Sequence, residues 1–236
     1  MRQNATSSDE KGGHIMLYIS NITIFDVLGY IGNIVSVIGG IFATKKLGLH
    51  PIIQFLSGIS TAFLGDMFFR DIILLHTTPY IFNHPIEIIT MVVIDISVIV
   101  WMKKKNLDKK FSKVLSIVNP ISIVIFAILG YERSISAREP WWFCIVTVWV
   151  SICGGEIIAV AIRALGTREW RHFTKTLNEN KFYYFFCAVV SVVCGCLNAL
   201  DVNNDTALII LTVFVMKADS LMKNKRLIEK GTKTYK

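Results

Sequence analysis

Seven long apolar runs alternate with short polar gaps along this chain of 236 residues. The runs span residues 24–44, 51–75, 81–102, 114–131, 141–165, 182–200 and 206–222. Each is close to the roughly 20 residues that a helix needs to cross about 30 Å of hydrocarbon. Backbone groups find no water at that depth, so runs of this length fold as helices and not as alternating barrel strands. The pattern therefore predicts an all-α integral membrane protein with seven transmembrane helices.

Short glycine motifs relate the first three runs to the next three. The positions that match at an offset of 90 residues are Gly40 with Gly130, Gly65 with Gly155, and Asp66 with Glu156. Repeat 1 then covers about residues 24–102 and repeat 2 about 114–200, within a membrane domain of residues 21–222. Three spans are an odd number, so the second copy inserts upside down, which predicts a 3+3 inverted repeat. The run 206–222 adds a seventh helix.

The basic residues predict the orientation of the chain. Of 25 Lys and Arg residues, 20 lie on one predicted side: in the gaps after the first, third and fifth runs, at the end of the fifth run (Arg163), or in the last run and beyond it. Such an excess marks the cytoplasmic side, so the N-terminus is predicted to lie outside. Residues 1–20 form a polar extension that we expect to be flexible, and residues 223–236 form a basic cytoplasmic tail.

Composition excludes several classes of function. Only 18% of the residues are charged and the mean hydropathy is +0.53, whereas soluble domains average about 25% charged residues. The net charge of +8 is spread over the gaps and not gathered on one folded face, so we expect no nucleic-acid partner. The five cysteines lie in apolar runs without zinc spacing, and we expect no metal or cofactor. Nucleotide-loop and hydrolase motifs are also missing, so the chain is not predicted to be an enzyme.

The acid in each glycine motif carries the candidate chemistry. An ionisable group at bilayer depth costs roughly 2.5–3.5 kcal/mol and usually faces a cavity or a partner. A helix interrupted at glycine exposes carbonyls that replace part of a cation's hydration. The predicted ion pathway consists of Gly65, Asp66, Arg70, Asp71, Gly154, Gly155 and Glu156. The alternative is that the glycines only let helices pack closely, which is the role predicted for Gly40 and Gly130.

Arg70 determines whether Asp66 can meet an ion. Arg70 lies one helical turn from Asp66 and directly before Asp71, so it can pair with either carboxylate. A pair with Asp71 leaves Asp66 available, whereas a pair with Asp66 weakens the case for a pathway. The alternative is a static buried ion pair that only holds helices together. Asp95, deep in the run 81–102, is a further candidate for the pathway.

A cluster of lysines follows the run 81–102. Lys103, Lys104 and Lys105 are predicted to bind anionic lipid head groups, each worth about 1 kcal/mol near a charged leaflet. The alternative is that these lysines only fix the topology.

Several segments carry a family resemblance. Residues 32–43, 60–74 and 79–82 read GNIVSVIGGIFA, STAFLGDMFFRDIIL and PYIF, and residues 126–130 read FAILG. They resemble the prokaryotic TRIC family of trimeric intracellular cation channels, whose bacterial members are often labelled glycine transporter-like. That family reads G-x(7)-G, then A-x-G-G-G-x-x-R-D-x-L-L, then P-x-F, with F-A-x-x-G in its second half. The resemblance spans about residues 24–222.

The resemblance implies a homotrimer in the cell (inner) membrane, with one potassium-permeable pore in each protomer. The pore would be lined where the second and fifth helices bend at their glycine clusters. This chain departs from the family because Asp66 and Met67 replace two glycines, and Glu156 follows the second glycine pair. Ile158 and Ala159 stand at the second Arg-Asp position.

We therefore hypothesise a monovalent cation channel, permeable to potassium. A secondary transporter of a small solute such as glycine is the alternative that the same inverted repeat would serve. A non-conducting scaffold would explain the altered glycine triplets. An intramembrane hydrolase that uses Asp66 and Glu156 has the least support.

Overall fold

The computed structural model of the chain describes residues 24–79, 85–103 and 108–233. Side chains are described for residues 27–64, 68–79, 86, 88–103 and 120–221. The elements in chain order are α2 (Ile24–Lys46), α3 (Pro51–Ile59), the π-helical segment η1 (Ser60–Leu74), α5 (Pro85–Lys103), α6 (Asp108–Ser136), α7 (Trp141–Thr167), α8 (Trp170–Glu179), α9 (Lys181–Ala199) and α10 (Asn204–Lys233). The described part of the chain contains no strand, so the predicted all-α class is confirmed.

Each of the seven predicted runs overlaps a helix, and the second overlaps the pair formed by α3 and η1. Three described helices are long and apolar enough to cross a membrane, namely Val27–Lys46, Trp141–Thr167 and Lys181–Ala199. Pro51–Leu64 and Phe68–Leu74 make a fourth span if this pair, bent by 44°, is counted as one. An integral, multi-pass membrane protein is therefore confirmed, while the number of seven spans stays a prediction.

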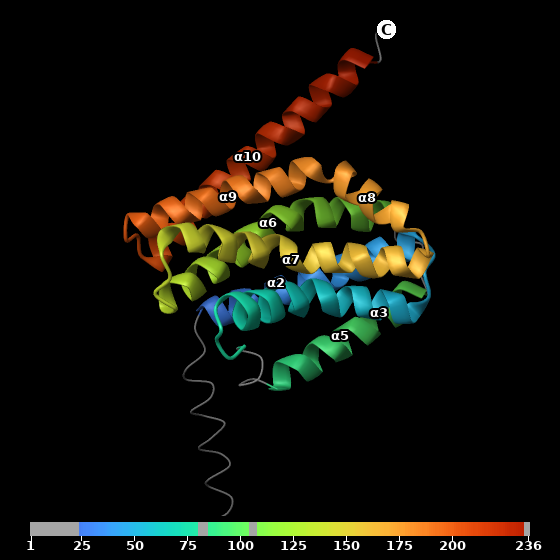
Figure 1. The fold of residues 1–236 in the computed structure, drawn as a ribbon. Coiled ribbons are helices and arrows are strands. Elements are labelled where there is room, and N and C mark those ends of the chain that lie inside the picture. The colour runs from blue at the N-terminus through green and yellow to red at the C-terminus, as the bar shows by residue number, and fades with distance from the viewer. Residues whose placement is uncertain (1–23, 80–84, 104–107, 234–236) are drawn as a thin grey trace, which may run out of the picture.

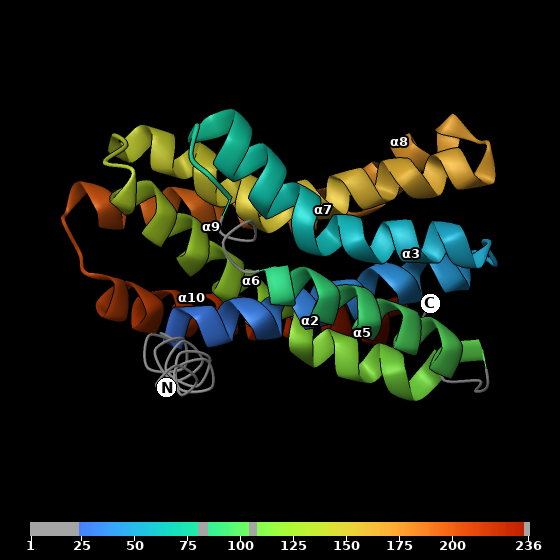
Figure 2. The ribbon, with the colours of Figure 1, turned by 90° about the horizontal axis from the view of Figure 1, so that it is seen from below.

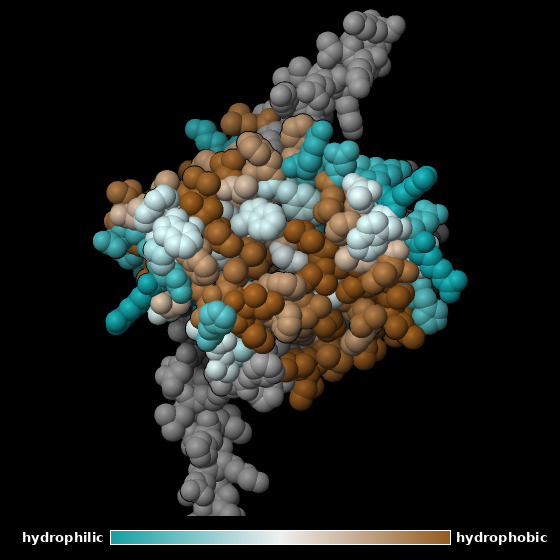
Figure 3. Space-filling model, in the orientation of Figure 1, coloured by the Kyte–Doolittle hydropathy of each residue, from teal (hydrophilic) through white to brown (hydrophobic). Residues whose placement is uncertain are grey.

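The ends of the helices gather at two opposite ends of the bundle (Figures 1 and 2). Lys45 and Lys46 end α2, Lys103 ends α5, and Arg168 follows α7 at the same end. Figure 3 shows apolar side chains over the middle of the molecule, with hydrophilic side chains at its two ends. This banding is what a bilayer requires of a protein that spans it.

Two helices differ from the sequence prediction. α8 occupies a gap for which no helix was predicted, and none of its residues is buried. Trp170 and Phe173 stack on one side of it with ring centroids 4.9 Å apart. Ten residues span about 15 Å, which is too short to cross a bilayer, so this amphipathic helix escapes a search for apolar runs. α10 continues to Lys233, so most of the predicted tail is helical.

The start of α3 is fixed by its first residues. Pro51 occupies the first turn, where a missing N–H costs nothing and the fixed φ suits a helix. The ring nitrogen Nδ1 of His50 accepts a hydrogen bond from the N–H of Ile52 at 3.3 Å. Between α2 and this cap the chain turns at Gly48, whose φ of +67° lies in the left-handed region that favours glycine.

The buried apolar side chains form two separate cores. The first contains Val37, Ile41, Phe42, Ala62, Phe63, Met91, Ile99 and Met102, all from α2, η1 and α5. The second draws its buried members from α6, α7, α9 and α10, between Ile123 and Val215. The cores divide between predicted repeat 1 on one side and predicted repeat 2 with the last helix on the other. In Figure 1, α2 and α6, which begin the two repeats, run in opposite directions.

Glycines allow the closest approaches between helices. A Cβ on Gly40 would lie 2.7 Å from the carbonyl oxygen of Ser57 and 2.8 Å from Oγ1 of Thr61. A Cβ on Gly130 would lie 2.7 Å from Oγ of Ser151. Thr61 and Ser151 are themselves 90 residues apart, so the two contacts recur at the offset of the glycine motifs.

A third close approach joins the two halves of the molecule. A Cβ on Gly155 of α7 would lie 2.5 Å from the carbonyl oxygen of Thr61 in η1. Real Cβ atoms do not come so near a carbonyl, and the obstacle is backbone, which cannot rotate away. The surfaces of η1 and α7 therefore meet only because residue 155 has no side chain.

We expect Gly155→Ala to lower the thermal midpoint of unfolding in detergent, since overpacking of this kind typically costs 1–3 kcal/mol. Gly39→Ala is the matched control, because nothing lies within 4 Å of a Cβ built there. That control should be as stable as the parent or gain about 0.5–1 kcal/mol from the helix preference of alanine. Equal midpoints for Gly155→Ala and the parent would contradict the close approach.

Candidate functional site

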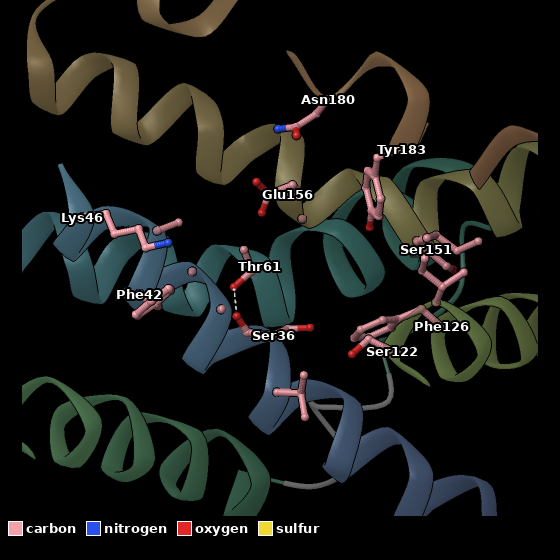
Figure 4. A pocket seen from close by; sticks show the side chains of 17 residues that line it. Ser36, Phe42, Lys46, Thr61, Ser122, Phe126, Ser151, Glu156, Asn180 and Tyr183 are labelled. Atoms are coloured by element: carbon pink, nitrogen blue, oxygen red, sulfur yellow. Dashed lines mark hydrogen bonds between the residues drawn. The ribbon is translucent and has the colours of Figure 1, made fainter. Parts of the chain in front are cut away.

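A cavity of about 640 Å³ lies where the two halves meet (Figure 4). Its walls come from α2, η1, α6 and α7, and from the residues around the start of α9. The polar lining residues are Ser36, Lys46, Thr61, Ser122, Ser151, Glu156 and Asn180. A cavity of this size with such a lining can hold water or a partly hydrated ion.

The cavity extends along the helices toward the basic end of the bundle. Lys46 is the last residue of α2, and Asn180 directly precedes α9. Ser151 and Phe126, in contrast, lie near the middle of α7 and α6. The ammonium group of Lys46 lies 4.4 Å from the centroid of the Phe42 ring, which holds one positive charge at this end of the cavity.

Hydroxyl and carbonyl oxygens line the middle of the cavity. Oγ1 of Thr61 lies 2.8 Å from the carbonyl oxygen of Ser36 and 2.7 Å from that of Gly58. The hydroxyl has one proton and can donate it to one carbonyl at a time. Figure 4 shows the contact between Thr61 and Ser36, which links η1 to α2 across the wall. Oxygens of this kind can replace water around a cation.

Glu156 brings a carboxylate to the cavity. Its Oε1 accepts a hydrogen bond of 2.5 Å from Nη2 of Arg163. The Arg163 side chain is only 4% exposed, whereas that of Glu156 is 33% exposed and lines the cavity. The guanidinium therefore lies behind the carboxylate, and its positive charge compensates a negative charge that still reaches the open space.

A second ion pair lies at the deep side of the cavity. Nε of Arg70 is 2.6 Å from Oδ1 of Asp71, and Nη2 is 3.2 Å from Oδ2. Both side chains are almost fully buried. Nη1 of Arg70 donates to Oγ of Ser151 at 3.2 Å, which ties η1 to a cavity-lining residue of α7. This group of three residues braces η1 against α7 where the polar lining ends.

The structure brings several of the predicted site residues together. Gly40, Gly155 and Glu156 line the cavity, and the Arg70–Asp71 pair reaches it through Ser151. Gly154 lies on α7 but does not line the cavity, and Gly130 packs against α7. Lys103 is exposed at the end of α5.

Other predicted positions lie outside the described residues. These are the surroundings of Gly65, the side chain of Asp66, and the residues Lys104 and Lys105. The role of Asp66 in the pathway therefore stays a prediction. The guanidinium of Arg70 lies on Asp71, while its relation to Asp66 lies outside the described side chains.

The two glycine motifs have different effects on their helices. The chain bends by 44° between Pro51–Leu64 and Phe68–Leu74, around Gly65. α7, in contrast, continues as one α-helix from Trp141 to Thr167, through Gly154 and Gly155. The expected interruption of this second helix is not present, because glycine weakens a helix without removing its hydrogen bonds. On α7 the glycine provides room for η1.

Three residues of the site were not predicted from sequence. Arg163 was noted but not paired with Glu156, although seven residues place both on one face of a helix. Thr61 and Ser151 were overlooked because hydroxyl residues are common in membrane helices and gave no separate signal. Within the described residues, no group of three His, Cys, Asp or Glu side chains could hold a metal ion.

Neither a protein-family model nor a curated protein matches this sequence. A solved structure described as showing the basis for conductance through TRIC cation channels is similar, with a TM-score of 0.68. The match covers 86% of this chain and 95% of the other, at 22% sequence identity. This chain has the TRIC fold. The resemblance seen in the sequence is thereby confirmed at the level of the fold.

We expect Arg70→Ala to destabilise the TRIC-fold bundle strongly. It leaves the buried carboxylate of Asp71 without its partner, and breaking a buried pair in this way costs about 3–5 kcal/mol. Ser151→Ala removes one hydrogen bond to the guanidinium but leaves the ion pair in place, and should cost less, about 1.5–3 kcal/mol. Thermal unfolding in detergent measures both, and a smaller effect for Arg70→Ala than for Ser151→Ala would contradict the arrangement.

Proposed function

We propose that this protein is a monovalent cation channel whose pathway runs through the cavity between α2, η1, α6 and α7. The observation that carries the proposal is the carboxylate of Glu156 at a cavity lined by hydroxyl oxygens, deep within an apolar bundle. The similar solved structure is described as that of a cation channel, which supports the same class of function. Potassium is the proposed main ion, on the resemblance to TRIC sequences.

A cation in this cavity would exchange part of its water for the hydroxyls of Ser36, Thr61 and Ser151. Glu156 would lower its energy there, because the carboxylate reaches the space while Arg163 stays behind it. Asp66 would supply a second negative charge from the opposite repeat. The negative groups would exclude anions in spite of Lys46 at the basic end.

The Arg70–Asp71 pair would form the barrier at the deep side of the cavity. Its guanidinium holds η1 to Ser151 of α7 and places a positive charge on the route of the ion. Passage would then require η1 to shift against α7, which breaks the charge-assisted hydrogen bond from Arg70 to Ser151 and leaves the ion pair intact. The bend around Gly65 gives η1 a place at which to flex.

Several accompanying features belong to the same proposal. The chain would work as a homotrimer in the cell membrane, with the N-terminus outside and the basic end, including Lys103, at the cytoplasmic leaflet. The outward side of α5 carries exposed Ile89, Val93 and Ile96. Such a surface suits lipid or a neighbouring protomer.

A secondary transporter is the alternative that one observation favours. The described lining of the cavity runs from the middle of the bundle to its basic end only. A site open toward one side is what alternating access needs, with the halves rocking about it. The two activities differ in measurable ways.

Reconstitution in planar bilayers under a potassium gradient tests the channel. We expect unitary currents that reverse near the potassium potential, and Glu156→Gln should reduce the conductance at least about tenfold. The change leaves Arg163 without its counter-charge. A charge roughly 8 Å from an ion, at an effective dielectric constant of about 20, repels it by about 2 kcal/mol.

Two variants control this measurement. Glu179→Gln makes the same chemical change on exposed α8 and should leave the currents unaltered. Glu156→Gln combined with Arg163→Met removes both charges and should restore much of the conductance. Currents that Glu156→Gln leaves unaffected would remove the cavity from the pathway. Saturable uptake of a small solute without unitary events would favour the transporter, and neither activity would favour a scaffold.

A further inference from the structure

Asp95 lies near the middle of α5 and is fully buried. Neither of its carboxylate oxygens has a hydrogen-bond partner among the described residues. Among the described residues, the buried Asp71 and the partly exposed Glu156 each face an arginine. Asp95 does not line the cavity, so the proposed pathway does not use it directly.

The carboxyl group of Asp95 lies against bare backbone. A Cβ on Gly58 would be 2.7 Å from Oδ2 and 3.0 Å from Oδ1 of Asp95. It would also be 3.0 Å from Cγ1 of Ile41 on α2. The glycine near the end of α3 therefore makes the space into which this side chain fits.

Among the described residues, the elements that pack on α5 bring no charged partner to Asp95. These elements are α2 and α3. α3 carries no titratable side chain, and the titratable side chains described on α2 are Tyr30, Lys45 and Lys46. Lys45 donates to the main-chain oxygen of Met102, two helical turns from Asp95, and Lys46 lies over Phe42. No ion pair among the described residues includes Asp95.

A carboxylate in such a place is far more costly than the neutral acid, because the charge is buried from water and meets no cationic partner among the described residues, with only the main-chain N–H of Ile59 as a donor toward it. We propose that Asp95 is a buried proton-binding site, occupied by a proton in the conformation described here. Release of that proton to water requires α5 to separate from Gly58, since the ionised group needs hydration. The closed contact between α5 and α3 is thus the protonated state, and the separated contact is the ionised state.

The contact also connects α5 to the wall of the cavity. The carbonyl oxygen of Gly58 lies 2.7 Å from Oγ1 of Thr61, which lines the cavity and reaches Ser36. Movement at Gly58 therefore alters where Thr61 places its hydroxyl. Through this path, protonation of Asp95 would control the width and the hydrogen bonding of the cavity. Only this last consequence rests on the proposed channel function.

Infrared spectroscopy of the full-length protein in lipid vesicles tests the proton site without any need for transport. The parent should show the C=O stretching band of a protonated carboxyl group at neutral pH. Asp95→Asn, which has almost the same shape, should lose that band. Glu179→Gln is the matched control and should retain it, because Glu179 lies exposed on α8, away from the bundle interior.

Two further measurements keep the result decisive. Gly58→Ala places a methyl group against the carboxyl group of Asp95 and should shift the band in frequency. Alkaline titration of the parent should remove the band, and this measurement does not depend on the folding of any variant. Absence of a protonated carboxyl band in the parent at neutral pH, or its survival in Asp95→Asn, would overturn the proposal.

The link to the cavity is measured on the same proteins in planar bilayers. Alkalinisation should change the open probability of the parent about 5–150-fold, the usual range for coupling between two sites, and leave Asp95→Asn unchanged. An equal response of parent and variant overturns the link. If the parent carries no current, the channel proposal fails, while the infrared result still decides the proton site.

Discussion

The contact between Gly155 and the backbone of Thr61 is the constraint on which the arrangement of the two halves depends. Each half buries its own apolar side chains, and the two cores have no member in common. What joins them is a helix crossing so close that a single methyl group would separate it. The crossing places Thr61, Ser151 and Glu156 around one space, because a wider separation would carry η1 and its hydroxyl away from α7. The position of the cavity thus follows from a missing side chain.

Asp71, Glu156 and Asp95 show three ways in which an apolar bundle can accommodate a carboxyl group. Asp71 is fully enclosed and receives two donors from one guanidinium. Glu156 shares its charge between an enclosed arginine and an open cavity. Asp95 has neither an arginine partner among the described residues nor an open cavity beside it, and its surroundings suit the neutral form. The chemistry assigned to each follows from these surroundings, since all three lie on helices and within apolar sequence.

Hydrophobic pattern was enough to predict the fold, because length and apolar character directly reflect the thickness of a bilayer. The repeat of Gly40 at Gly130 also corresponds to matching contacts, against Thr61 in one case and Ser151 in the other. The site was less predictable. Pairing of Arg163 with Glu156 depends on rotamers, and the straight course of α7 depends on what packs against its glycines. The sequence shows that residue 155 is a glycine. It does not show whether the helix bends at this glycine or a neighbouring helix packs against it.

Two independent cores also affect how the molecule can move. The apolar side chains of each core keep their packing partners when one half slides past the other. Such a displacement therefore leaves the packing inside each core unchanged. Several small residues lie at the boundary, among them Gly40, Gly155, Thr61 and Ser151, and their side chains present few obstacles to sliding. The energetic barrier to rearrangement is therefore concentrated in a handful of polar contacts. Each core can therefore move as one unit relative to the other, along a boundary that contains small side chains.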